Sequence, residues 1–484
     1  MLGVIEYIKQ ATEESSDIKY RTISIGEGTV QMVYNEAVTD SMFISNVVIR
    51  SVSSVLQESF KQKSFEKEQT NELITRIKNE LNAVNIMEIF IESSDIFYYI
   101  FSGYTLLVIE DKILAVETKG HLDRSISEPQ IESDIKGSKD CFIENYMQNI
   151  GLIRKRIKTE KLVLKENIVG RRSKTKAGIL YLSDVADVES VKRLEDEIKK
   201  IDIDGILDSN YVREIILSKG DSTVFPTVIS TERPDVVAYN LLEGRIAIVI
   251  ENSPFALVFP AFFTDFFKSM DDYYQINRNI FITRTLRYIA FFITLFLPAI
   301  YVALITFNHE VIPSELLVSF TVQRDGVPAP AFLEALLMIL AFELLREGDY
   351  RVPSMAGSAL SIVGALILGD AAVSAGIVSS IMIIVIAITN ISALIFTDIN
   401  MINTLRYWRI VFLLSAALAG LIGIFIAVVI FVIKMASINS LDRPYLFPFS
   451  PFDKEGMKDT FARENISEMT KRSDLLTDNI TRQK

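Results

Sequence analysis

The 484-residue sequence has one cysteine, Cys141, and two histidines, His121 and His309. A single cysteine excludes an internal disulfide and any metal site built from several cysteines. The two histidines lie far apart in the sequence, so the chain offers no zinc site of the usual kind. We therefore expect no bound metal and no disulfide framework.

The motifs of common catalytic and nucleotide-binding sites are also missing. The sequence contains no GxSxG, no Walker A motif, no Rossmann glycine pattern and no Cys–His motif. It has no long basic patch, and its net charge is -11 with a pI of about 5.1, which argues against nucleic acid as a partner. Glu6 and Lys9 interrupt the apolar run that a signal peptide needs at the N-terminus. We expect a protein that is not an enzyme, binds no cofactor and keeps its first half in the cytoplasm.

Hydrophobicity is divided sharply along the chain. Charged residues are frequent up to Arg287, whereas apolar runs dominate residues 288–432. The apolar run at residues 286–307 carries no charge after Arg287. Its length matches the roughly 20 residues that a helix needs to cross a membrane. Arg278, Arg284 and Arg287 precede or open this run, which places its start on the cytoplasmic side. The sequence therefore predicts an integral membrane protein.

Further apolar segments predict an all-α bundle of about five membrane helices. The segments after the first run cover residues 328–346, 355–372, 376–396 and 410–433. The segment 328–346 contains Glu334 and Glu343, so it either crosses the membrane or re-enters it with its carboxylates facing protein or water. Five crossings would place the C-terminal tail opposite the N-terminus, whereas a re-entrant segment would return the tail to the same side.

The two carboxylates of this segment have different expected roles. Glu334 and Glu343 are nine residues apart, which puts them on nearly opposite faces of a helix. They cannot form one carboxylate pair, and Glu334 is the candidate for an intramembrane function. Glu343 has Arg346 three residues later and is expected to form an ion pair with it.

A segment rich in small residues is the candidate for a pore. Two interpretations remain open for it, close packing of helices and a stripe that faces a water-filled axis in an oligomer. In the second, Ser358, Ser361, Ala365 and Leu368 share one helix face. An apolar gate would lie near Leu366 or Leu368, with Val363 beside it. The candidate pore-lining and gate residues are therefore Ser358, Ser361, Val363, Ala365, Leu366 and Leu368.

The first half reads as two related α/β modules. Residues 28–40 and 178–187 each predict a strand that ends in an acidic turn before a helix. Residues 102–116 and 243–258 each predict a β-hairpin. The offsets of 150 and 141 residues favour a duplicated module over a chance match of generic strand patterns.

These patterns give four expected regions. An α/β subdomain covers residues 1–135, and a linker helix with a second α/β subdomain covers 136–285. The transmembrane domain covers 286–434, and a polar, mobile tail covers 435–484. Basic residues at 154–156 and at 171, 172 and 174 predict solvated faces and intersubunit salt bridges, with binding of lipid headgroups as the alternative.

Several stretches resemble the A subunits of the GerA-type spore germinant receptor family. They read RSISEPQIESDIKG, NIGLIRKRI, TERPD, SPFALVFP, DDYY, FLEALLMILAFELLRE and SSIMIIVIAIT, at residues 124–137, 149–157, 231–235, 253–260, 271–274, 332–347 and 379–389. The resemblance covers nearly the whole chain and keeps the order of the family. Residues 136–139 and 348–349 depart from the usual family pattern, which affects local loops only.

The resemblance implies a fold and a function. Family members have two α/β subdomains before the membrane helices and lie in the inner membrane of the dormant spore, with the N-terminal domain facing the core. They are thought to form an oligomer, a pentamer, that acts as a nutrient-gated channel for monovalent cations. Their partners are a transporter-like B subunit, a lipoprotein C subunit and membrane lipid. Two alternatives stay open, a SpoVAF-like channel that amplifies germination and a membrane scaffold or transporter component without its own pore.

Overall fold

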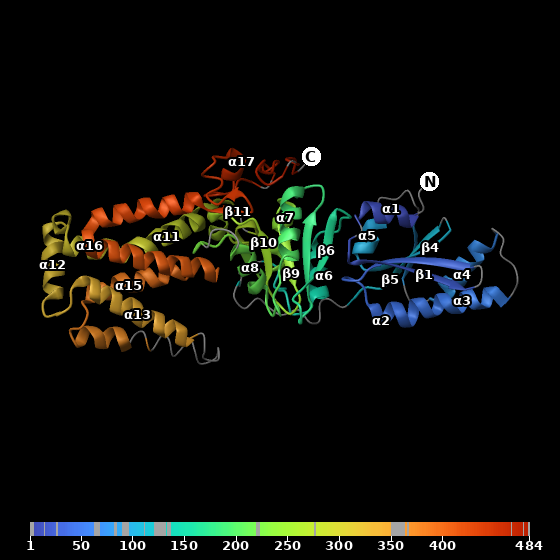
Figure 1. The fold of residues 1–484 in the computed structure, drawn as a ribbon, viewed down its shortest axis with the longest axis horizontal. Coiled ribbons are helices and arrows are strands. Elements are labelled where there is room, and N and C mark those ends of the chain that lie inside the picture. Colours follow the sequence, from blue (N-terminus) through green and yellow to red (C-terminus); the bar gives the residue numbers. More distant parts are fainter. Residues whose placement is uncertain are drawn as a thin grey trace. The chain divides into compact units, whose positions relative to one another are not determined.

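The computed structural model of the chain (Figure 1) contains two compact units. The α/β unit comprises residues 1–222, 228–261 and 466–484, and the helical unit comprises residues 223–227 and 262–465. The described residues are 4–13, 15–25, 28–61, 68–81, 85–89, 96–110, 112–120, 132, 137–218, 223–274, 277–349, 364, 367–465, 467–477 and 479–482.

Two five-stranded antiparallel sheets form the α/β unit and share one strand order. The first has the order β1 (Ile18–Ile25), β2 (Gly28–Asn35), β4 (Tyr104–Ile109), β5 (Lys112–Glu117), β3 (Ile86–Ile89). The second has the order β6 (Leu162–Val169), β7 (Thr175–Leu182), β9 (Ile246–Ile250), β10 (Ala256–Phe259), β8 (Ile229–Thr231). The α/β fold class is therefore confirmed, and the two related sequence patterns occupy equivalent strands, β2 with β7 and β4–β5 with β9–β10.

Local backbone geometry supports the same correspondence. The hairpin turns contain Glu110 with φ 52° and Asn252 with φ 65°, and the strands are preceded by Gly103 with φ 88° and Gly244 with φ 94°. A side chain with a Cβ is strained at the positive φ values of positions 103 and 244, which explains why both are glycine. The acidic residues after β2 and β7 are helix N-caps: Asp40 accepts from two backbone N–H groups of α2, and Asp187 accepts from two of α7.

Helices flank both sheets. Around the first sheet lie α1 (Val4–Ala11), α2 (Ser41–Phe43), the π-helical turn η1 (Ile44–Ile49), α3 (Arg50–Lys61), α4 (Glu68–Glu80) and α5 (Ile96–Phe101). Around the second lie α6 (Tyr146–Arg156), α7 (Val188–Lys199), α8 (Ser209–Ser218) and α9 (Pro234–Leu242). The central strands β4 and β9 are buried along their whole length, so each sheet is covered by apolar side chains on both faces.

A buried ion pair joins the two sheets' subdomains. The guanidinium of Arg154 in α6 donates to both oxygens of Asp17, at 2.7 and 2.9 Å, and to the Ser15 hydroxyl at 3.0 Å. Asn35 also donates to Asp17, at 2.6 Å. Burial alone would raise the pKa of Asp17, but the charge of Arg154 and these hydrogen bonds hold it below its usual value. The prediction of a solvated face is therefore wrong for Arg154, which is buried with its partner inside the chain. Arg171 is exposed and pairs with Asp202 of the same chain.

The helical unit is built around two long apolar helices. Its elements are η2 (Phe263–Phe267), α10 (Asp271–Tyr274), α11 (Asn277–Thr306), η3 (His309–Val311), α12 (Ser314–Arg324), α13 (Ala331–Asp349), α15 (Ser380–Ala393), α16 (Ile399–Ser437), the two-residue strands β11 (Asn439–Ser440) and β12 (Arg443–Pro444), and α17 (Lys454–Met457). Residues 280–306 of α11 and the whole of α16 are each long and apolar enough to cross a membrane. We call the end where α11 begins the base of this unit, and the end where α11 stops its far end.

The predicted spans are recovered unevenly. The first lies within α11, and the segment 328–346 corresponds to α13. The span 376–396 is helical only over the 14 residues of α15. Most of the span 355–372 lies outside the described residues, with 364 and 367–372 in helical conformation.

The predicted continuous span over residues 410–433 is wrong. Within α16 the backbone leaves the helical region at Ala419 (φ -143°) and at Gly420 (φ 58°, ψ -138°). Beyond this break the chain reverses direction. The reversal is shown by the rings of Trp408 and Phe431, whose centroids lie 4.9 Å apart. In a straight helix, 23 residues would separate them by about 35 Å. Residues 399–418 and 421–437 therefore form the two antiparallel arms of a hairpin (Figure 1).

The reversal determines where the C-terminal tail lies. The hairpin tip is at the far end, where Asn308 accepts from the backbone N–H of Leu421 at 3.0 Å. The second arm returns to the base, where the carbonyl of the buried Tyr445 accepts from the backbone N–H of Phe263 at 2.9 Å. The tail was expected to be polar and mobile, yet it carries buried residues. Its residues up to 465 belong to the helical unit, and residues 466–484 belong to the α/β unit.

The first prediction concerns the hairpin. A Cβ placed on Gly423 would clash with the backbone oxygen of Ser415 in the other arm, so Gly423→Ala must force the arms apart. We expect a loss of about 1–3 kcal/mol in the free energy of unfolding of the helical unit. The measurement is Trp408 fluorescence in detergent, since this chain has a single tryptophan. Gly369→Ala is the control, because its Cβ would meet nothing closer than 3.8 Å; equal effects of the two changes would contradict the hairpin.

The second prediction concerns the α/β unit. Asp17→Asn leaves the buried guanidinium of Arg154 without its counter-charge, which typically costs about 3–5 kcal/mol. The single cysteine reports on this unit, because burial and the charges of Glu232 and Asp140 raise the pKa of Cys141 to about 11 and keep the native thiol unreactive. Maleimide labelling of Cys141 should therefore begin at lower temperature in the variant. The exposed pair is the control: Asp202→Asn should leave the labelling curve unchanged, and an equal shift there would refute the assignment.

Candidate functional site

Glu334 lies buried between three helices at the far end of the helical unit. One carboxylate oxygen accepts from Arg324 at the end of α12, at 3.1 Å. The other accepts from the backbone N–H of Ser379, the N-cap of α15, at 2.9 Å. Glu334 thus joins α12, α13 and α15, and its charge is balanced by a guanidinium and by the positive end of a helix. The expectation that this carboxylate faces protein agrees with its position.

Glu343 occupies a second polar cluster, nearer the base. It forms the expected ion pair with Arg346, but two arginines of α16 contact it as well. Arg409 donates to it at 2.9 Å, and Arg406 lies 3.4 Å away. Arg409 is buried and also donates to the side-chain oxygen of Asn390 in α15, at 3.1 Å. This cluster ties α13, α15 and α16 together inside an otherwise apolar bundle.

The predicted pore residues can be placed only in part. Ser358, Ser361, Val363, Ala365 and Leu366 lie outside the described residues. Leu368 lies in a helical stretch at residues 367–374 and is half-buried. The pore and gate therefore remain predictions. Glu334 and Glu343 belong to separate clusters with different partners, as their spacing predicts.

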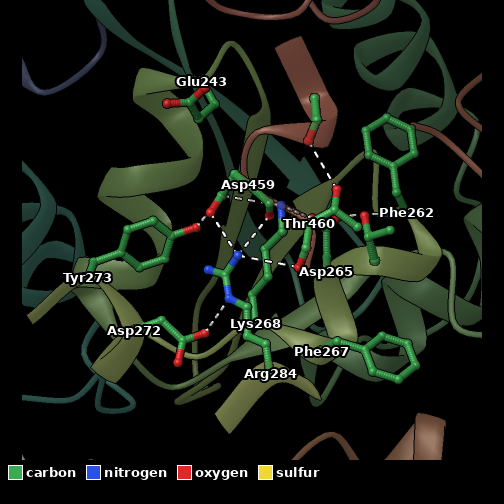
Figure 2. A network of polar contacts seen from close by, with 12 residues as sticks. Glu243, Phe262, Asp265, Phe267, Lys268, Asp272, Tyr273, Arg284, Asp459 and Thr460 are labelled. Atoms are coloured by element: carbon green, nitrogen blue, oxygen red, sulfur yellow. Dashed lines mark hydrogen bonds and ion pairs between the residues drawn. The ribbon is translucent and has the colours of Figure 1, made fainter. Parts of the chain in front are cut away.

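A third network lies at the base and is shown in Figure 2. Arg284, fully buried in the first turns of α11, donates to Asp272 of α10 at 2.8 Å and to Asp459 of the tail at 2.9 Å. The Tyr273 hydroxyl donates to Asp459 at 2.6 Å, and Lys268 lies 3.4 Å from the same carboxylate. The network thus connects the entry to the first long helix, that helix itself and the tail.

The electrostatics of this network favour an ionised Asp459. Burial alone would raise its pKa, but the charges of Lys268 and Arg284, with hydrogen bonds from Tyr273 and Arg284, lower it to about 2. Arg287 strengthens the same arrangement by donating to both oxygens of Asp272, at 2.7 and 3.0 Å. A bidentate arginine–carboxylate pair of this kind fixes geometry as well as charge.

These clusters can hold charge and join helices. Among the described residues, no group of three or more His, Cys, Asp or Glu side chains could hold a metal ion. Each of the three clusters joins at least one carboxylate to at least one arginine side chain.

Sequence reasoning missed the partners in this arrangement. Arg284 and Arg287 were used only as markers of membrane orientation, and Asp459 was assigned to a mobile tail. The one available signal was the DDYY stretch, because its second and third residues are Asp272 and Tyr273. Arg409 lies directly before the predicted span 410–433, and its position in the sequence does not point to Glu343 as its partner.

Comparisons with known proteins agree on one group. A family model described as Bacillus/Clostridium GerA spore germination protein matches residues 6–475. Spore germination protein KA of Bacillus subtilis (strain 168) is 36% identical over 460 residues, which cover 94% of this chain and 82% of the relative. Spore germination protein XA of Bacillus anthracis is 34% identical over 463 residues, covering 94% of this chain and 91% of the relative.

A solved structure is also similar to part of the chain. It is the crystal structure of the N-terminal domain of the A subunit of the Bacillus megaterium spore germinant receptor GerK3. It is 32% identical, with a TM-score of 0.41, and the match covers 54% of this chain and 94% of that one.

The third prediction follows from the pKa of Asp459. Since its folded pKa of about 2 lies below the unfolded value of 3.8, ionised Asp459 stabilises the fold above pH 4, and this contribution disappears as the pH falls through 2. Asp459→Asn should therefore cost about 2 kcal/mol at pH 6 and about half of that at pH 3. The measurement is Trp408 fluorescence during unfolding at each pH. A cost that does not change between pH 6 and pH 3 would show that the charge of Asp459 is not what matters.

Proposed function

The chain belongs to the Bacillus/Clostridium GerA family of spore germination proteins, and we propose that it is the A subunit of a spore germinant receptor. Several copies, five by the expectation stated above, would form a nutrient-gated channel for monovalent cations. Opening of this channel would release cations from the spore core and start germination. The relatives named above are spore germination proteins, and we propose no catalytic activity.

The observation that supports a channel is the placement of charge inside the apolar bundle. Buried Glu334 and Arg409 lie between helices that otherwise present apolar side chains. Ionisable residues at membrane depth are costly, and proteins retain them mainly along ion paths and at elements that move. Glu334 is therefore our candidate for an intramembrane functional residue.

The proposed path runs along the segment rich in small residues. Ser358, Ser361, Ala365 and Leu368 would face the axis of the oligomer, and Val363, Leu366 and Leu368 would form an apolar gate that opens by wetting. The α/β unit would lie on the core side of the spore inner membrane. A transporter-like B subunit and a lipoprotein C subunit would be the partners.

Gating requires contacts that differ between the closed and open states. A partner that binds the α/β unit or the tail could act through the network of Arg284, Asp272 and Asp459, because this network holds the start of α11. A shift of the tail would then move the base of the first membrane helix. Breaking the network should change the opening of the channel, even though none of its members need line the pore.

The fourth prediction tests the channel. Purified protein with its B and C subunits, reconstituted in liposomes, should release trapped potassium when nutrient is added. Leu366→Ala should make the vesicles leak before nutrient is added, because a smaller side chain widens and wets an apolar gate. Leu418→Ala is the matched control, since Leu418 is exposed at the hairpin tip, far from the proposed axis segment in sequence.

Two outcomes would count against this function. Vesicles that release no potassium with all three subunits and nutrient present would indicate a scaffold without a pore. Flux that needs no nutrient, from a protein that captures no B or C subunit, would favour the amplifying channel over the receptor.

A further inference from the structure

The two long helices expose one continuous apolar zone. Neither residues 288–306 of α11 nor residues 410–433 of α16 include a charged residue, and many leucine, isoleucine, valine and phenylalanine side chains in both are exposed. The first charges at the base end of this zone are Arg287, Arg409 and Lys434. An uncharged zone of this length is typical of a surface that faces hydrocarbon.

Ring contacts place the base ends of these elements at one depth. The ring centroid of Phe431 lies 4.9 Å from that of Trp408 and 6.4 Å from that of Phe291. Tyr288 lies three residues before Phe291, and Lys434 lies three residues after Phe431, so both are about one helical turn closer to the base. The exposed Lys434 therefore lies at the depth of Tyr288.

This depth carries the residue types of a membrane boundary. Tyr407 is exposed beside Trp408, and the partly exposed Arg406 precedes it toward the base. Tyrosine and tryptophan gather at the headgroup level of membranes, and lysine and arginine side chains near helix ends extend toward the headgroups. For a helical unit that lies in a membrane, the hydrocarbon therefore ends near Tyr288.

The C-terminal tail returns to the same depth. The ring of Phe461 lies 4.8 Å from that of Tyr288 and 5.7 Å from that of Phe449. Phe452 follows Phe449 by three residues, so its backbone lies within about 11 Å of it. Phe461 is 41% exposed and Phe452 is 74% exposed. The tail thus presents two exposed aromatic side chains close to the level where the apolar zone ends.

We propose that residues 449–461 of the tail are anchored in the headgroup layer of the membrane, with the rings of Phe452 and Phe461 inserted at the edge of the hydrocarbon. Apolar side chains of interfacial segments typically reach about 5–10 Å into this boundary. The proposal rests on the membrane placement of the helical unit given under the proposed function. It does not depend on ion conduction.

The anchor would act on the ion network at the base. Asp459 lies two residues before Phe461 and pairs with Arg284, which lies four residues before Tyr288. Four residues correspond to about 6 Å of helix, comparable with the headgroup layer of one leaflet. The ion pair would therefore lie among headgroups, and insertion of Phe461 would help to hold Asp459 against Arg284.

A second polypeptide that covers Phe461 is the alternative occupant. The membrane is favoured because the exposed Leu286 and Ile289 of α11 lie within a turn of Tyr288, so the apolar surface reaches this depth without interruption. A lipid surface that already contacts α11 here needs no further partner to cover Phe461. The experiment below distinguishes the two occupants.

The single tryptophan makes a depth measurement possible. Trp408→Phe removes the native fluorophore, and Phe461→Trp or Phe452→Trp then places one reporter in the tail. The full-length chain is placed in phosphatidylcholine nanodiscs whose lipid carries bromine either near the headgroup end or near the methyl end of the acyl chains. Bromine quenches tryptophan only at short range. We expect both reporters to be quenched, about twofold more strongly by bromine near the headgroup end.

Two matched reporters calibrate the measurement. Ile289→Trp lies on α11 beside Tyr288 and should show the same preference for bromine near the headgroup end. Tyr98→Trp is an equally exposed aromatic position in α5 of the α/β unit and should not be quenched. Because Phe452 is the more exposed of the two tail positions, Phe452→Trp keeps the test valid if Phe461→Trp disturbs the packing on Tyr288.

Three outcomes would overturn the anchor. In the first, neither tail reporter is quenched more than Tyr98→Trp although Ile289→Trp is quenched, which would leave the membrane placement of the helical unit intact. In the second, Ile289→Trp is not quenched either, and the membrane placement fails as well. In the third, quenching of the tail reporters disappears when the B and C subunits are added, which would assign this surface to a protein interface.

Discussion

The reversal of α16 at Ala419 and Gly420 is the constraint on which the helical unit depends. It converts one 39-residue apolar segment into two arms that pack against each other and against α11. The tip is held at the far end by Asn308, and the second arm leads the chain back to the base. Without this reversal, residues 438–465 could not reach the start of α11.

The network at the base is a direct consequence. Asp459 meets Arg284 across 175 residues of sequence because the hairpin returns the chain to that place. The same tail then continues into the α/β unit, where Arg472 donates to the carbonyl of Leu242 at 2.7 Å and Arg482 pairs with Glu243. One segment of chain is therefore anchored at the base of α11 and in the α/β unit. In the proposed receptor subunit, such a segment would offer a route for a signal.

Buried charge follows one rule in both units. The pairs of Asp17 with Arg154, Asp459 with Arg284 and Glu334 with Arg324 each join two different segments of the fold. An unpaired charge in these positions would cost several kcal/mol, so each pair fixes how its elements meet. These buried pairs determine the geometry of the fold more than they add to its free energy of unfolding. That property would suit the proposed channel, whose parts must change contacts between a closed and an open state.

The sequence by itself determined the features that depend on local patterns. The alternation of β2 and β7 predicted equivalent strands, Asp40 and Asp187 were placed before helices, and the apolar run from residue 286 predicted the first long helix. Hydrophobic periodicity and capping act within a few residues, so they can be read without the fold. Tertiary structure alone decided where α16 turns and which charges meet. Gly420 is one of several glycines in apolar segments, and only its contact with Asn308 and Phe307 distinguishes it. Opposite charges 137 or 175 residues apart have many possible partners, and packing selects one.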